Sequence, residues 1–110
     1  MAKYERRISG DFDIVLEKIK DGILEASASA SLEDESRFSS EETMCAVQVY
    51  ERYRAFGNNR VSLTVTLFKS SEEMIVSGIT SGGSQAVFMK INTVGEETFL
   101  EVFRKTVDSI

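Results

Sequence analysis

Two runs of alternating residues, separated by a turn, constrain the fold of this chain most strongly. Residues 60–70 alternate four apolar side chains, from Val61 to Leu67, with polar ones, which is the period of a β-strand with one buried face. The preceding run covers residues 44–56, and Gly57-Asn58-Asn59 separates the two. Because Gly and Asn tolerate positive φ, this triplet predicts a β-hairpin.

The length of the turn predicts which side chains of the hairpin are buried. A three-residue loop pairs residues of equal parity, which places Tyr53 beside Leu63 and Ala55 beside Val61 on the inner face. Cys45 then becomes a small core residue. Glu51 also points inward in this register, so it pairs with Lys18 or Arg104 on a helix, is turned outward by a bulge, or faces a ligand with a raised pKa.

Two segments have the apolar period of a helix. In the first, Asp11 can cap the N-terminus, and residues 12–26 carry apolar side chains at spacings of three and four. Gly22 interrupts this stripe, which indicates a frayed last turn or a close approach to the sheet. In the second, Thr93 and Glu96 have the spacing of a capping box, and an apolar stripe follows over residues 99–110.

Three further strands are expected. They cover residues 3–8, an alternating segment from Ser27 to Phe38, and residues 74–81. Glu33-Asp34-Glu35 is expected at a solvated edge or turn, since its spacing is not that of a calcium loop. In the last strand, an odd loop places Ile75 and Ile79 inside and an even loop places Met74, Val76 and Gly78 inside; we favour the first.

The order of these elements, β-α-β-β-β-β-α, predicts an α+β fold. We expect a two-layer structure with an antiparallel sheet of about five strands and both helices on one face of the sheet. A chain of 110 residues has the size of one domain, so residues 1–110 are expected to form a single α+β domain. The other face of the sheet is then left open.

The composition excludes several kinds of chemistry. The chain has no His, Trp or Pro and one Cys, which excludes catalytic groups that use imidazole, His-containing zinc sites and an intramolecular disulfide. We therefore expect no cofactor and no metal. The net charge of −5 disfavours nucleic acid and anionic membranes as partners. Without an apparent signal peptide or a long apolar run, the expected location is cytoplasmic.

Two candidate sites remain. The first is the open face of the sheet, with self-association into a homodimer as the favoured role and a merely solvated face as the alternative. The hairpin register assigns six residues to it: Tyr50, Arg52, Arg54, Thr64, Thr66 and Phe68. The second is a glycine loop that could hold a small anionic ligand or serve an enzyme, formed by Gly82, Gly83 and Ser84 with Lys90 as counter-charge. No catalytic residues stand out, so a binding role is favoured over an enzyme.

Residues 77–84, Ser-Gly-Ile-Thr-Ser-Gly-Gly-Ser, and residues 95–100, Gly-Glu-Glu-Thr-Phe-Leu, carry a resemblance to other proteins. With these stretches the whole chain resembles a family of small uncharacterised bacterial proteins. The resemblance implies a bacterial cytoplasmic setting and a compact α+β domain, and it supplies no activity or catalytic residues. The order of the elements is also similar to the fold of the TATA-box-binding protein, which is an analogy of fold and does not imply function.

Overall fold

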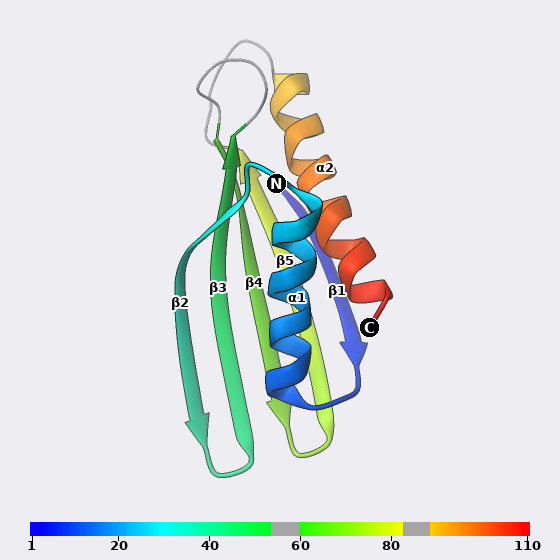
Figure 1. Cartoon of the computed structure of the whole chain (residues 1–110). Helices are drawn as coiled ribbons and strands as arrows, with labels where there is room; N and C mark the ends of the chain where they lie inside the picture. The colour runs from blue at the N-terminus through cyan, green and yellow to red at the C-terminus, as the bar shows by residue number, and fades with distance from the viewer. Residues whose placement is uncertain (54–59, 83–88) are drawn as a thin grey trace.

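The computed structural model describes residues 1–53, 60–82 and 89–110 and forms two layers, a sheet and a pair of helices (Figure 1). The described elements follow each other along the chain as β1 (Ala2–Ile8), α1 (Phe12–Ala26), β2 (Ser31–Ser40), β3 (Thr43–Tyr53), β4 (Arg60–Ser70), β5 (Glu73–Gly82) and α2 (Met89–Asp108). The five strands form one antiparallel sheet in the order β1-β5-β4-β3-β2. The predicted α+β class and element order are confirmed.

Both helices cover the same face of the sheet (Figure 1). The apolar stripes of α1 and α2 pack on inward side chains of β3, β4 and β5, and together they form one core. The members with no exposed surface include Ile19, Ile23, Tyr50, Leu63, Val65, Leu67, Val76, Phe99 and Phe103. The burial of these side chains against a single layer of helices leaves the other face of the sheet without a covering element among the described residues.

Local signals in the sequence explain how α1 begins. Asp11 caps the helix, and its carboxylate accepts a hydrogen bond from the Ile14 backbone N–H at 3.1 Å. The sequence suggested that Gly22 marks a frayed last turn or a close approach to the sheet, and the structure shows neither. A Cβ at this position would lie 2.3 Å from Cγ2 of Thr106, so the glycine allows α1 and α2 to approach each other.

Helix α2 begins earlier than its capping-box pattern predicts. Its backbone is helical from Met89, so Thr93 and Glu96 lie inside the helix. Glu is a good helix former at interior positions, and a Thr-to-Glu spacing alone therefore does not fix a helix start. Further along, Phe103 packs on Gly78 of β5, where a Cβ would lie 2.4 Å from the ring. Gly78 thus lets α2 lie close to the sheet.

The predicted register of the β3–β4 hairpin is wrong. Tyr50 pairs with Leu63 and Tyr53 pairs with Arg60, so residues of opposite parity face each other. The expected turn at residues 57–59, and Ala55 with it, lies outside the described residues. As a result the inward side chains of β3 are Ala46, Gln48 and Tyr50, and Glu51 and Cys45 lie on the open face.

The favoured parity of β5 is also wrong. Ser70 pairs with Glu73, which makes the β4–β5 connection two residues long, and an even loop turns Met74 and Val76 inward. Ile75 and Ile79 therefore lie on the open face.

The beginning of β2 differs from the predicted strand as well. Ser27 caps the C-terminus of α1, and the strand starts only at Ser31, because the small Ser and Ala side chains before it have little strand propensity. Glu33-Asp34-Glu35 lies within this edge strand, and the pairing register shifts between Leu32 and Asp34 as in a β-bulge. A bulge and charged side chains are common ways to protect an edge strand from unwanted pairing.

Candidate functional site

The candidate site is the face of the sheet opposite the helices, which we call the open face. Its side chains follow from the strand pairing, because residues that pair across antiparallel strands point to the same side. The open face comprises Lys3, Glu5 and Arg7 of β1; Ser31, Asp34, Ser36, Phe38 and Ser40 of β2; Thr43, Cys45, Val47, Val49, Glu51 and Tyr53 of β3; Arg60, Ser62, Thr64, Thr66, Phe68 and Ser70 of β4; and Glu73, Ile75, Ser77, Ile79 and Ser81 of β5.

A row of large side chains crosses one end of this face. Phe38 pairs with Cys45, Cys45 with Phe68, Phe68 with Ile75, and Ile75 with Arg7. Phe38 is 63% exposed and Phe68 is 40% exposed. We call these five residues the aromatic row. Its four neighbouring apolar side chains form a continuous patch, which is the kind of surface that proteins bury in an interface.

Two more rows lie beside the aromatic row. The middle row runs Ser36, Val47, Thr66, Ser77, Glu5, and in it the Ser77 hydroxyl donates to the Glu5 carboxylate at 2.9 Å. The third row runs Asp34, Val49, Thr64, Ile79, Lys3. In both rows, β-branched side chains occupy β3 and β4, and every charged side chain lies on an edge strand.

Glu51 lies near the far end of the face and has a cation beside it. Its carboxylate Oε1 lies 3.1 Å from Nη1 of Arg60, and Arg60 also donates a hydrogen bond of 2.5 Å to the Tyr53 hydroxyl. Of the alternatives drawn from the sequence, this excludes a pair with Lys18 or Arg104. The partner of Glu51 comes from the neighbouring strand of its own hairpin.

Three of the six residues assigned to the open face are on it, namely Thr64, Thr66 and Phe68. Tyr50 and Arg52 are not, because the opposite-parity register turns them toward the helices. Arg54 lies outside the described residues.

Tyr50 is a core residue with no exposed surface. Its hydroxyl donates to the side-chain oxygen of Gln48 at 2.5 Å, and the Gln48 amide donates to the Glu35 carboxylate at 2.6 Å. Burial raises the pKa of the Tyr50 phenol far above its ordinary value, so the hydroxyl stays protonated. The same hydrogen bond from Gln48 lowers the pKa of Glu35. These bonds explain how a polar residue such as Gln48 can be buried.

Arg52 supports the packing of α2. Its guanidinium lies 4.6 Å from the centre of the Phe99 ring and donates to the Thr98 hydroxyl at 2.6 Å. A cation over an aromatic face is attracted by the ring quadrupole. Arg52 therefore belongs to the helix side of the sheet and contributes nothing to the open face.

The proposed anion loop can be placed only at its first residue. Gly82 ends β5 and pairs with Val61. Gly83, Ser84 and the side chain of Lys90 lie outside the described part of the chain.

A groove of about 500 Å³ lies elsewhere, between the end of α1 and α2. Its lining combines apolar surface with Lys105 and Glu101, whose charges are opposite in sign.

In residues 1–53, 60–82 and 98–110, no group of three metal-ligating side chains comes together. The described helices include none with the length and apolar character needed to cross a membrane.

The most apolar part of the open face was not predicted from the sequence. Phe38 was assigned to a strand without a site, Cys45 to the core, and Ile75 to the inner face. The signal that could have joined them is the cross-strand pairing, which depends on the loop lengths of two hairpins.

The comparisons with known proteins now identify the family. The model of a family of unknown function, DUF6054, matches residues 1–110. The chain belongs to this family. No curated protein and no solved structure matches it. The expected resemblance to a family without known activity is thereby confirmed, and the similarity to the fold of the TATA-box-binding protein stays a prediction.

Proposed function

We propose that this protein is a small interaction domain that forms a homodimer through its open face. The observation that carries the proposal is the aromatic row: Phe38 and Phe68 expose 63% and 40% of their surface on a face that no described element covers. Burying such side chains stabilises an association by about 25 cal/mol per Å² of apolar area. A second copy presents the same patch, as a two-fold interface requires.

The size of the open face supports a specific dimer. Strands β3 and β4 have 11 residues each, and five strands lie side by side. At about 3.4 Å per residue and about 4.8 Å per strand, and with the shorter strands β1, β2 and β5 taken at their own lengths, the face covers roughly 800 Å² of each copy. Two such faces bury roughly 1,600 Å² in total, which is the standard size of a specific interface.

The charges of the open face disfavour a nucleic acid as partner. Lys3, Arg7 and Arg60 are its cations, and Glu5, Asp34, Glu51 and Glu73 are its anions. A protein that binds a phosphate backbone neutralises it with a surplus of Lys and Arg. The balanced charges here instead suit a surface that contacts a copy of itself.

The alternative function, a site for a small anionic ligand at Gly82, Gly83 and Ser84, has no contact among the described residues to support it. It is tested by thermal shift against nucleotides, acyl phosphates and carboxylates. A ligand at 100 times its Kd adds about 2.7 kcal/mol of stability.

The dimer is tested by light scattering after size exclusion over a range of concentrations. We expect a mass that rises toward twice 12.3 kDa in the wild type. Phe68→Asp puts two charges into the centre of a two-fold interface and should raise the Kd by roughly 100-fold or more. The matched control is Ile14→Asp, since Ile14 is 57% exposed but lies on α1 in the helix layer. A wild type that stays at 12.3 kDa at all concentrations, or equal effects of the two variants, would overturn the proposal.

A further inference from the structure

We propose that the two copies pack open face on open face about a two-fold axis that runs parallel to the strands, so that β1 of each copy lies over β2 of its partner. This inference rests on the proposed homodimer and adds its geometry. It predicts that Lys3 of one copy meets Asp34 of its partner, twice in each dimer.

The position of the strands makes this pairing possible. β4 is the central strand of the order β1-β5-β4-β3-β2, so an axis over β4 exchanges β5 with β3 and β1 with β2. Rotation about an axis along the strands keeps each residue at its height, and each of the three rows therefore meets the same row of the partner. The two ends of a row then face each other.

The ends of the rows are complementary. Lys3 and Asp34 end the third row, and they carry opposite charges. Arg7 and Phe38 end the aromatic row, where a guanidinium can stack on a ring. Between them, Val49 meets Ile79 and Phe68 meets its own copy. Within the three rows no pair of like charges is brought together by this arrangement. Beyond them, Arg60 of β4 faces its own copy, with its charge paired to Glu51 of its own hairpin.

A two-fold axis across the strands gives the opposite result. At the height of the middle row it places β1 over β1 of the partner and reverses the heights, so Lys3 faces Arg7 and Glu5 faces Glu5. At the height of the aromatic row, the position that lays this row on its own copy, Arg7 faces Arg7. Like charges that meet directly are destabilising. The charge pattern of β1 therefore disfavours a crosswise axis at either height.

The pairing of Lys3 with Asp34 of the partner is retained when the two sheets cross at the angle that is usual for packed sheets. Packed sheets cross at about 30°, which displaces the edge of a sheet of this width by roughly 5 Å. Neighbouring rows are separated by two residues, or about 7 Å. A lysine side chain spans the remaining offset, so Lys3 still reaches Asp34 and not the next row.

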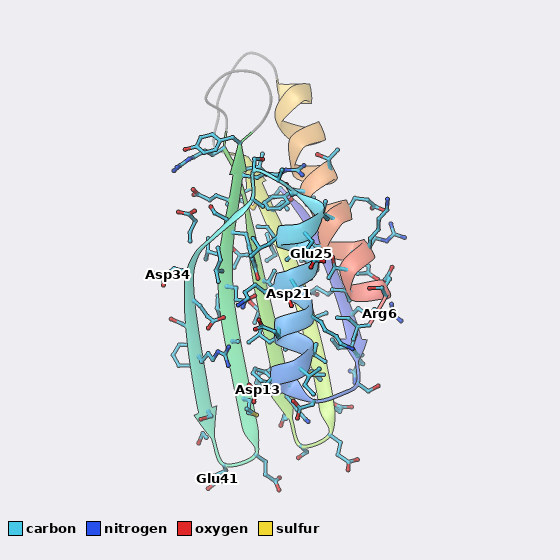
Figure 2. The ribbon with its side chains drawn as sticks, viewed as in Figure 1. Arg6, Asp13, Asp21, Glu25, Asp34 and Glu41 are labelled. Atoms are coloured by element: carbon cyan, nitrogen blue, oxygen red, sulfur yellow. The ribbon has the colours of Figure 1, made fainter. Side chains whose placement is uncertain are left out.

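Neither Lys3 nor Asp34 takes part in an ion pair with another described residue. Asp34 accepts a hydrogen bond of 2.8 Å from the Glu35 backbone N–H, and its other carboxylate oxygen is available. Both side chains are exposed on opposite edges of the sheet, with Asp34 on the outer strand β2 (Figure 2). They are too far apart to meet within one copy, since three strands separate them.

The experiment is a charge reversal with rescue, read as the Kd of the dimer at low salt. Lys3→Glu and Asp34→Lys should each raise the Kd by roughly tenfold, because each creates two repulsive pairs per dimer. The double variant Lys3→Glu/Asp34→Lys restores both pairs and should return the Kd to within about twofold of the wild type. The controls Lys18→Glu and Asp21→Lys make the same charge changes on α1, where Asp21 is exposed in the helix layer (Figure 2).

The outcomes separate the two proposals. A wild type without any dimer overturns the proposed function itself. A dimer in which Lys3→Glu lowers the Kd supports the axis across the strands, since the introduced carboxylate would then meet Arg7 of the other copy, and overturns this inference. A dimer whose Kd responds to the single variants without rescue in the double variant, or responds no more than to the controls on α1, also overturns it.

Discussion

The two faces of the sheet are built from the same strands but differ in what their side chains can do alone. On the helix side, Leu63, Val65 and Val76 have no exposed surface, and glycines at positions 22 and 78 let the helices approach closely. On the open face, Phe38 and Phe68 remain exposed and hydroxyl groups fill the centre. The helix side is buried by α1 and α2 of the same chain, whereas the open face becomes buried only when another molecule covers it.

The largest expected difference between the faces is in the cost of removing a phenylalanine. Phe103 has no exposed surface and packs on Gly78 and edge-on against Tyr4, so Phe103→Ala should lower the free energy of unfolding by about 3–5 kcal/mol. Phe68→Ala should lower it by less than about 1 kcal/mol when measured where the protein is monomeric. Urea unfolding at low protein concentration measures both. Equal costs would show that the open face is as fully packed as the helix side.

A smaller effect is expected where the two helices touch. Ala normally stabilises a helix by roughly 1 kcal/mol over Gly, but Gly22→Ala should destabilise by about 1–3 kcal/mol because its Cβ would lie 2.3 Å from Thr106. In a Thr106→Ala background the Cγ2 and Oγ1 atoms are gone and only the Cβ of residue 106, at 3.1 Å, remains, so the same change should destabilise far less. Thermal unfolding of the wild type, the two single variants and the double variant measures the coupling free energy between positions 22 and 106. If Gly22→Ala is neutral or stabilising in the wild type, the close contact of α1 and α2 is wrong.

The smallest expected effect is on the stability of the protein at acidic pH. Gln48 holds the pKa of Glu35 below its ordinary value, so Glu35 binds protons less readily in the folded than in the unfolded state. Its contribution to stability is then present above about pH 4.3, the ordinary pKa of a glutamate, and is lost as the pH falls through the lower folded pKa. Glu35→Gln should flatten the loss of stability below that pH. An unchanged profile would mean that the bond to Gln48 does not act on Glu35.

The overall fold could be predicted because its signals are local. Asp11 as a cap, the apolar stripe of residues 12–23, and the alternation of residues 60–70 each depend on neighbours in the sequence. They fixed the α+β class, the order of the elements and the bounds of β4.

The inner and outer faces of β3 could not be predicted, for a physical reason. The outward residues Val47 and Val49 are more apolar than the inward Gln48, so the pattern favours the wrong face. Gln48 is buried because Tyr50 and Glu35 satisfy its amide, and such bonds exist only once the register is set. The wrong register then moved Tyr50 and Arg52 onto the open face, and the wrong parity of β5 moved Ile75 away from it.

The most direct test of the account is the reactivity of Cys45, the single cysteine of the chain. It is half-buried and lies between Phe38 and Phe68 in the aromatic row. With a thiol reagent in constant excess, we predict that the rate of labelling falls as the protein concentration rises, and that Phe68→Asp abolishes this fall. A rate that is the same at every protein concentration would contradict the claim that a second copy covers the open face.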